Sequence, residues 1–246
     1  MNACLKKTET CIQPLLVLSA SILRSLLTSY PEAFAFSLKS LSASSLSRFV
    51  CLVGCGSYEG VCDKDGCDLN PYRYNVYDFY GPGDSFKVNS LKPMTVVTQF
   101  ITTDGTDSGN LTEIRRFYVQ DGVKIPSPQL DVGGTTYNAI SDSFCADSRA
   151  YFDEPHNGFK DNGGMAAMGD ALDRGLVLTM SIWDDHYAHM LWLDSTYPVN
   201  GTTQGNARGS CPTTSGDPSD VEVNAANSTV TYSNIKVGAI GTTNAL

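Results

Sequence analysis

The chain of 246 residues is long enough for one large domain or two small ones. Only 17% of its residues are charged, against roughly 25% in an average soluble domain, and its formal net charge is −9. Binding to nucleic acid or to an anionic membrane needs a basic surface, so this acidic balance excludes both as partners. The 10% of aromatic residues exclude a disordered acidic tail.

Residues 1–57 differ in charge from the rest of the chain. They hold five basic and two acidic residues, hence +3, so residues 58–246 carry −12 to give the total of −9. Lys6 and Lys7 precede an apolar stretch over 12–27, and a small-x-small cleavage site follows, as in a secretory signal peptide. Because an arginine interrupts the apolar stretch, a transit peptide or translated non-coding sequence is the alternative interpretation.

Eight cysteines and three N-glycosylation sequons favour an oxidising, secreted setting. The predicted acceptor residues lie in turn-like stretches: Asn110, Asn200 and Asn227. A zinc site is the rival interpretation of the cysteines, but the pairs Cys51-x3-Cys55 and Cys62-x4-Cys67 have no second matching pair and no nearby histidine. We therefore expect an extracellular protein with disulfides and no metal site.

Downstream of residue 57, short runs rich in β-branched and aromatic residues alternate with turn clusters. Five runs are predicted to be strands: Met94–Ile101, Ile114–Gln120, Leu176–Trp183, Ala188–Asp194 and Thr229–Val237. One short helix is predicted over Gly163–Leu172, where apolar residues recur at spacings of three and four. Many short strands between Gly and Pro turns predict an all-β fold, an antiparallel β-sandwich or jelly roll.

Two of these runs are predicted to pair as a hairpin around Asp184–Tyr187. One face of this hairpin is then the core side: Leu176, Leu178, Met180, Ile182, Leu191 and Leu193. The other face carries Trp183 and Trp192, about four residue steps or roughly 13 Å apart. Exposed indoles at this spacing suit stacking on sugar rings, with Asp184, Asp185 and Asp194 accepting hydrogen bonds from hydroxyls. The alternative is a second core layer that buries both tryptophans, and the pattern alone does not separate the two.

Other chemistry finds little support in the sequence. In the hairpin register His189 falls on the core side and His186 in the loop, so the two histidines diverge. This favours surface or internally paired histidines over a metal site or a catalytic base. The sequence carries no Ser-His-Asp order, phosphate loop or nucleotide-binding glycine pattern.

Five segments carry a more specific pattern, in chain order: Cys62–Arg73, Phe79–Gly83, Ser181–Pro198, Ala207–Cys211 and Val230–Gly238. Together they resemble the C-terminal half of glycoside hydrolase family 7 catalytic domains, which are secreted cellulases. The resemblance implies a curved, concanavalin A-like β-jelly roll whose concave sheet binds cellulose or other β-1,4-glucan chains, without a cofactor. Because the loop from Tyr197 to Arg208 is kept, the resemblance favours the cellobiohydrolase type over the endoglucanase type.

The resemblance also implies roles for individual residues. Trp183 and Trp192 match tryptophans that stack glucosyl units, which favours the sugar-binding interpretation of the hairpin. The other implied substrate contacts match the product side or the cleft: Asp65, Asp68, Arg73, Tyr197 and Arg208, with Asp184 beside Trp183. Cys67 and Cys145 match a disulfide of the family.

The family's catalytic pair is absent from the printed sequence. Family 7 hydrolysis is retaining and uses two carboxylates about 5–5.5 Å apart, which the family supplies from one strand as Glu-x-Asp-x-x-Glu. None of the six glutamates here begins that pattern: Glu9, Glu32, Glu59, Glu113, Glu154 and Glu222. We therefore name no catalytic residue.

These observations set the expected domain organisation. Residues 1–57 are expected to be a non-homologous segment, a signal-like leader or a gene-model artefact, and residues 58–246 the C-terminal portion of a family 7 catalytic domain. The expected family-level function is retaining hydrolysis of β-1,4-glucosidic bonds in cellulose by a monomeric enzyme, with this chain alone inactive. The alternative is a non-catalytic glucan-binding remnant or inactive fragment.

Overall fold

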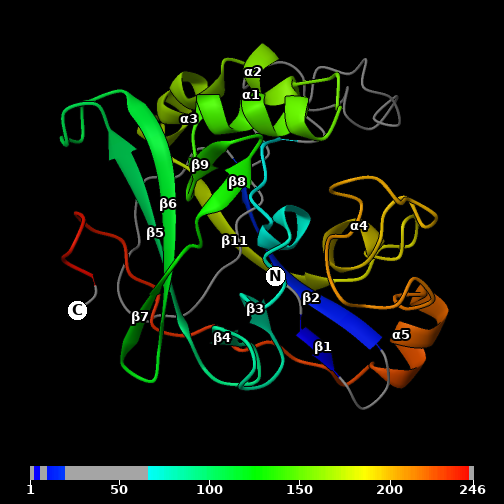
Figure 1. The fold of residues 1–246 in the computed structure, drawn as a ribbon. Coiled ribbons are helices and arrows are strands. Elements are labelled where there is room, and N and C mark those ends of the chain that lie inside the picture. Colours follow the sequence, from blue (N-terminus) through cyan, green and yellow to red (C-terminus); the bar gives the residue numbers. More distant parts are fainter. Residues whose placement is uncertain (1–2, 6–9, 20–65, 244–246) are drawn as a thin grey trace, which may run out of the picture.

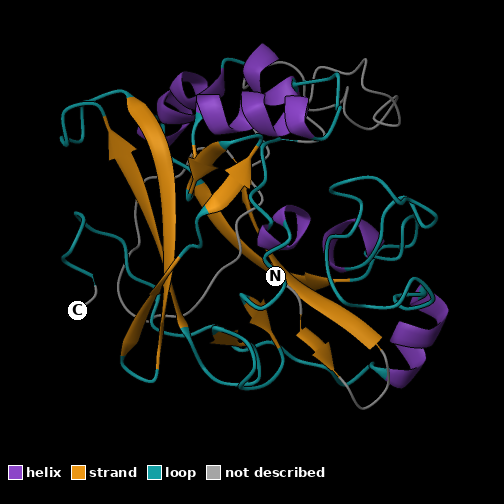
Figure 2. Ribbon diagram, in the orientation of Figure 1, coloured by secondary structure: helices purple, strands orange, loops and turns teal. Residues whose placement is uncertain are grey.

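The computed structural model describes residues 3–5, 10–19 and 66–243. Its strands form two larger antiparallel sheets and two smaller pairs (Figures 1 and 2). The first sheet has the order β10-β6-β5, with β7 also paired to β6. Its strands are β5 (Thr95–Thr102), β6 (Leu111–Gln120), β7 (Val123–Pro126) and β10 (Ala139–Ile140).

The second sheet has the order β1-β2-β11. Its strands are β1 (Ala3–Leu5), β2 (Thr10–Ser19) and β11 (Val177–Trp183). β2 runs antiparallel to β11, with Ser19 opposite Val177 and Gln13 opposite Trp183. The apolar stretch of the predicted leader therefore supplies the backbone neighbour of β11.

The smaller pairs and the helices complete the fold. β3 (Tyr80–Gly81) pairs in parallel with β4 (Val88–Asn89), and β8 (Leu130–Val132) forms a hairpin with β9 (Thr135–Tyr137). The helices are a 3-10 helix η2 (Pro71–Tyr74), α1 (Asp142–Tyr151), α2 (Gly158–Asp161), α3 (Gly164–Asp173), α4 (Leu191–Asp194) and α5 (Pro218–Asn224). In Figure 1, α1, α2 and α3 gather at one end of the β5–β6 sheet, and α3 contacts β6. Within the described ranges, no helix has the length and apolar character needed to cross a bilayer.

Three of the five predicted strands are confirmed, as β5, β6 and β11, and the predicted helix is confirmed as α3. The other two strand predictions are wrong. Thr229–Val237 forms no strand and carries an isolated bridge position at Ile235, because no neighbouring strand extends along it in the described part of the chain. Ala188–Asp194 forms turns and α4, for a reason given with the site.

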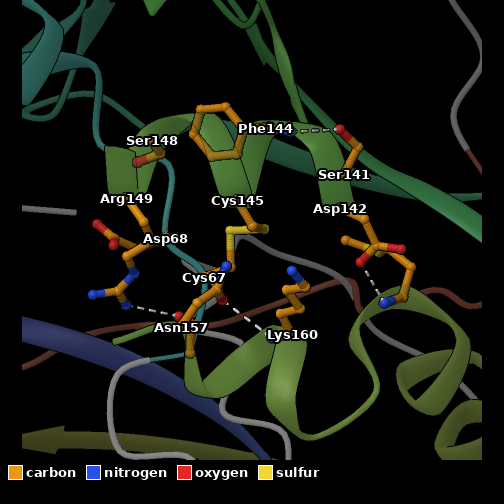
Figure 3. The surroundings of a disulfide bond; sticks show 12 residues. Cys67, Asp68, Ser141, Asp142, Phe144, Cys145, Ser148, Arg149, Asn157 and Lys160 are labelled. Atoms are coloured by element: carbon orange, nitrogen blue, oxygen red, sulfur yellow. Dashed lines mark hydrogen bonds between the residues drawn. A yellow bond between two sulfur atoms is a disulfide. The ribbon is translucent and has the colours of Figure 1, made fainter. Parts of the chain in front are cut away.

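The expectation of a single helix is also wrong, because α1 is as long as α3. It begins after Ser141, whose hydroxyl oxygen accepts a hydrogen bond from the backbone N–H of Phe144 at 3.1 Å (Figure 3). Phe144 and Cys145 are buried on its inner face. The Cys145 sulfur is bonded to that of Cys67, so the predicted disulfide is confirmed.

The main core lies between β6, β8 and the three clustered helices. Its fully buried centre includes Leu130, Phe144, Phe159 and Met165. β6 contributes two side chains to this core with the help of a β-bulge, at which the pairing with β5 shifts between Ile101 and Thr102. The extra residue reverses the side-chain alternation, so that Leu111 and Ile114 both face this core.

One predicted core face is exposed instead. Leu178, Met180 and Ile182 alternate along β11 and are 38%, 48% and 42% exposed; we call them the apolar stripe. Their alternation was correctly expected from the sequence, since the three side chains share a face. Their burial was not, because within the described ranges no layer covers that face of β11 closely enough to bury it.

Candidate substrate-binding surface

The predicted hairpin after β11 does not form. Backbone hydrogen bonds close within the segment instead: the N–H of His189 donates to the carbonyl of Asp185, and that of Leu191 donates to the carbonyl of Ala188, at 2.9 and 3.0 Å. His189 and Met190 both have left-handed backbone angles, with φ of 53° and 60°. Two consecutive left-handed residues turn the chain out of the extended conformation, so the segment cannot return alongside β11.

Asp185 fixes this turn and, through it, Trp192. Its carboxylate accepts hydrogen bonds from the backbone N–H groups of Tyr187 and Ala188, and from Nε1 of Trp192 at 2.8 Å. Burial alone raises the pKa of Asp185, but these hydrogen bonds outweigh it and leave the pKa below its usual range. Trp192 is therefore held by a charged hydrogen bond on α4. The hairpin that was predicted to carry Trp183 and Trp192 on one face does not form, and the Trp183 side chain lies outside the described part of the structure.

Asp194, at the end of α4, is buried without a hydrogen-bond partner among the described residues. The residue is 1% exposed, and neither carboxylate oxygen has a hydrogen-bond partner in the described part of the chain. Burial raises its pKa to about 7. Because both carboxylate oxygens are shielded from solvent, the expectation that Asp194 accepts hydrogen bonds from substrate hydroxyls is wrong for this structure.

A second group of predicted residues meets around Arg73, at the end of η2. Arg73 is 5% exposed, its Nε donates to the carbonyl of Gly205 at 3.1 Å, and its guanidinium lies 3.9 Å above the Phe152 ring. Its Nη1 is 3.6 Å from Asp68, and its Nη2 donates to Glu154 at 2.6 Å. These contacts place Asp68 and Arg73 in one cluster.

Glu154 joins three guanidinium groups. Besides Arg73 it accepts from Nη1 of Arg149 at 2.9 Å, and Nη2 of Arg208 lies 3.9 Å away. Burial lowers the pKa of Arg208, and the neighbouring Arg73 charge lowers it further. Three cations against the two carboxylates of Glu154 and Asp68 leave the cluster with net positive charge. The sequence analysis named neither Glu154 nor Arg149 as a site residue, and no local pattern marks them.

The loop from Tyr197 to Arg208 folds back onto this cluster. A bridge pairs Thr196 with Ala207, and the N–H of Tyr197 donates to the carbonyl of Asn206 at 2.9 Å. Gly205 has φ of 84°, and a Cβ there would lie 2.3 Å from the Phe152 ring, so only glycine lets its carbonyl reach Arg73. The pairing of Thr196 with Ala207 brings Tyr197 and Arg208, the two ends of the loop, close together.

Asn70 links the arginine cluster to α4. Its Nδ2 donates to the carbonyl of Arg208 at 2.8 Å and lies 3.5 Å from that of Leu193, next to Trp192. Through Asn70, the cluster of Asp68, Arg73 and Arg208 and the backbone of α4, which carries Trp192, form one neighbourhood, and Tyr197 begins the loop that reaches it. Asp65 lies outside the described residues. Asp184 is partly buried in the turn that follows β11.

This neighbourhood combines an anchored indole with guanidinium donors and carboxylate acceptors. Such a set suits a neutral polyhydroxylated ligand, whose hydroxyls both donate and accept and whose ring faces are apolar. The predicted glycan acceptors Asn110, Asn200 and Asn227 are all exposed, and one of them, Asn200, lies in the loop from Tyr197 to Arg208.

The similarity of the chain to known proteins agrees with this chemistry. Residues 30–244 match the family described as glycosyl hydrolase family 7. An exoglucanase GH7B from Limnoria quadripunctata is 52% identical over 185 residues, which are 74% of this chain and 40% of that protein. This chain thus spans about two fifths of the length of that relative.

Solved structures show the same fold. A family 7 cellobiohydrolase from Daphnia pulex superimposes with a TM-score of 0.67 at 55% identity, over 69% of this chain and 39% of that one. A cellobiohydrolase from Melanocarpus albomyces, solved with cellotetraose, gives a TM-score of 0.64 at 39% identity, over 73% of this chain and 40% of that one. The predicted fold class, an incomplete antiparallel β-sandwich of the jelly-roll type, is confirmed.

Proposed function

The chain belongs to glycosyl hydrolase family 7, and on that premise we propose that it supplies part of the cellulose-binding surface of a secreted cellulase of the cellobiohydrolase type. The observation that carries this proposal is the 52% identity to an exoglucanase over most of this chain. The anchored Trp192 and the cluster around Arg73 support it, because they offer a stacking surface beside donors and acceptors for hydroxyls.

The reaction served by this surface is retaining hydrolysis of β-1,4-glucosidic bonds. That reaction needs a nucleophilic carboxylate and a second carboxyl group that protonates the leaving oxygen. The printed sequence contains no Glu-x-Asp-x-x-Glu segment. We therefore assign substrate contacts and no catalytic pair to this chain: Asp65, Asp68, Arg73, Trp183, Asp184, Trp192, Tyr197 and Arg208.

The lack of a Glu-x-Asp-x-x-Glu segment in the printed sequence favours a second function, namely glucan binding without hydrolysis. Two assays on the full chain separate the functions: turnover of a soluble aryl cellobioside, and retention on microcrystalline cellulose. Retention without turnover assigns a binding function, and turnover restores an enzymatic one. Loss of both overturns the proposal.

Substitution of Trp192 locates the binding surface. We expect Trp192→Ala to weaken cellulose retention by about 2 kcal/mol, roughly 30-fold, the effect of deleting a central aromatic contact. Tyr77→Ala is the matched control, because Tyr77 is an exposed aromatic residue that is not among the assigned substrate contacts. Equal losses in the two variants would show that retention is non-specific.

Secretion and glycosylation are further parts of the proposal. All three sequon asparagines are exposed, as glycosylation requires. The Cys67–Cys145 disulfide is what an oxidising compartment favours. A mobility shift after endoglycosidase treatment of the natively expressed protein tests both at once.

A further inference from the structure

Three potential metal ligands meet where the turn after β11 approaches α5. Nε2 of His186 lies 2.8 Å from a carboxylate oxygen of Glu222 and 3.8 Å from Oδ2 of Asp184. One ligand atom from each residue lies within 4.8 Å of the other two. From this geometry we propose that Asp184, His186 and Glu222 form a binding site for a divalent transition metal ion of the zinc class.

The separations match the size of such a site. Zinc bonds to histidine nitrogen and carboxylate oxygen are about 2.0–2.2 Å long, and the edge between two tetrahedral ligands is then roughly 3.3 Å. The measured separations of 2.8 and 3.8 Å lie on either side of this length. Small side-chain rotations suffice to place all three atoms around one ion, because His186 and Glu222 are 71% and 57% exposed.

Asp184 provides the independent sign that a ligand is missing. Its Oδ2 is buried from solvent and has no hydrogen-bond partner within the described ranges. A buried carboxylate oxygen without a donor is costly. A cation between Asp184 and His186 would satisfy Oδ2 and leave Oδ1 for the substrate contact proposed above.

The surrounding charge favours a cation and the ligand types favour zinc. The sequence holds no Lys or Arg over 175–207 or 209–235, the two stretches that contribute the ligands. Asp217 and Asp220 add further negative charge on α5. An imidazole ligand selects zinc and its neighbours over calcium and magnesium, which prefer oxygen alone. Three protein ligands leave a fourth position for water.

This proposal revises the expectation of no metal site, which rested on the divergence of His186 and His189. His186 does diverge from His189, but its partners are Asp184, two residues away, and Glu222, 36 residues away. A bound ion would tie the turn after Trp183 to α5.

Calorimetric titration of the oxidised full chain with Zn²⁺ tests the proposal. We expect one site whose affinity falls at least tenfold in His186→Ala and in Glu222→Gln and is unchanged in His156→Ala, a histidine outside the cluster. Titration with Co²⁺ guards against binding by cysteines, because thiolate ligands would add a charge-transfer band that this site cannot give. With EDTA present, the melting temperatures of wild type and variants should agree, since both side chains are exposed.

The proposal would be overturned by no zinc binding in the wild type, by equal binding in wild type and His186→Ala, or by a thiolate band with cobalt. Calcium binding as tight as zinc binding would also overturn it, because histidine would then not be a ligand.

Discussion

Removal of the Cys67–Cys145 disulfide tests whether the cluster around Arg73 depends on a covalent tie to α1. The two cysteines are 78 residues apart and both are buried in the main core. In the chain-entropy treatment, a loop of that length restricts the unfolded chain by about 4.5 kcal/mol at 25 °C. We expect Cys67→Ala/Cys145→Ala to lower the free energy of unfolding by 2 to 5 kcal/mol, on the order usual for native disulfides.

The measurement is urea unfolding without reductant, followed by tryptophan fluorescence, because Trp192 lies on α4, which Asn70 links to the cluster. Cellulose retention should also fall, since Cys67 adjoins Asp68 and lies near Arg73. A loss of stability below 1 kcal/mol with unchanged retention would refute the reasoning, because the segment from Cys67 to Arg73 would then be held by its packing alone.

Three other substitutions probe charge and burial. The pKa of Asp194 is raised to about 7 from a reference value of 3.8, so the folded state favours the protonated form. The free energy of unfolding therefore falls as the pH rises from about 4 to about 7. Asp194→Asn should remove this fall and, in urea unfolding, be more stable than wild type above pH 7 by up to about 4 kcal/mol. Glu154→Gln should lower the free energy of unfolding by about 2 kcal/mol, because it leaves the buried Arg73 with Asp68 as its one carboxylate partner among the described residues. The control is Glu113→Gln, which breaks the exposed pair of Glu113 and Arg115 and should lower it by under 1 kcal/mol. Threonine at all three positions of the apolar stripe should raise the soluble fraction and reduce binding of a hydrophobic dye, and an unchanged fraction would show that the stripe does not drive association.

Where the sequence predicted local structure correctly, the elements are defined by their own residues. β5, β6 and β11 follow from β-branched and aromatic runs, and α3 from apolar residues at helical spacing. The segment 188–194 has a similar composition and fails because Asp185 draws the backbone into a turn. α1 was missed because its apolar face is short, and the signal that could have revealed it is the cap at Ser141.

In the candidate site, too, the residues that stand in recognisable sequence segments could be predicted, and those that join through long-range contacts could not. Similarity to the family pointed to Asp68, Arg73 and Arg208, which stand in recognisable segments. Glu154 joins them from 81 residues beyond Arg73, and nothing in its own surroundings marks it. Glu222 is hidden for the same reason, since its contact with His186 crosses 36 residues.

The two adjacent aspartates after Trp183 show how far a sequence motif can determine function. Both were expected to accept hydrogen bonds from sugar hydroxyls. Asp185 already receives three hydrogen bonds, one of them from the Trp192 ring, so its capacity is used to position the indole. Asp184 keeps a buried oxygen that has no donor among the described residues. Asp185 thus positions another side chain, whereas the adjacent Asp184 is open to a ligand. The difference arises from the turn after β11, where the sequence analysis had predicted a hairpin.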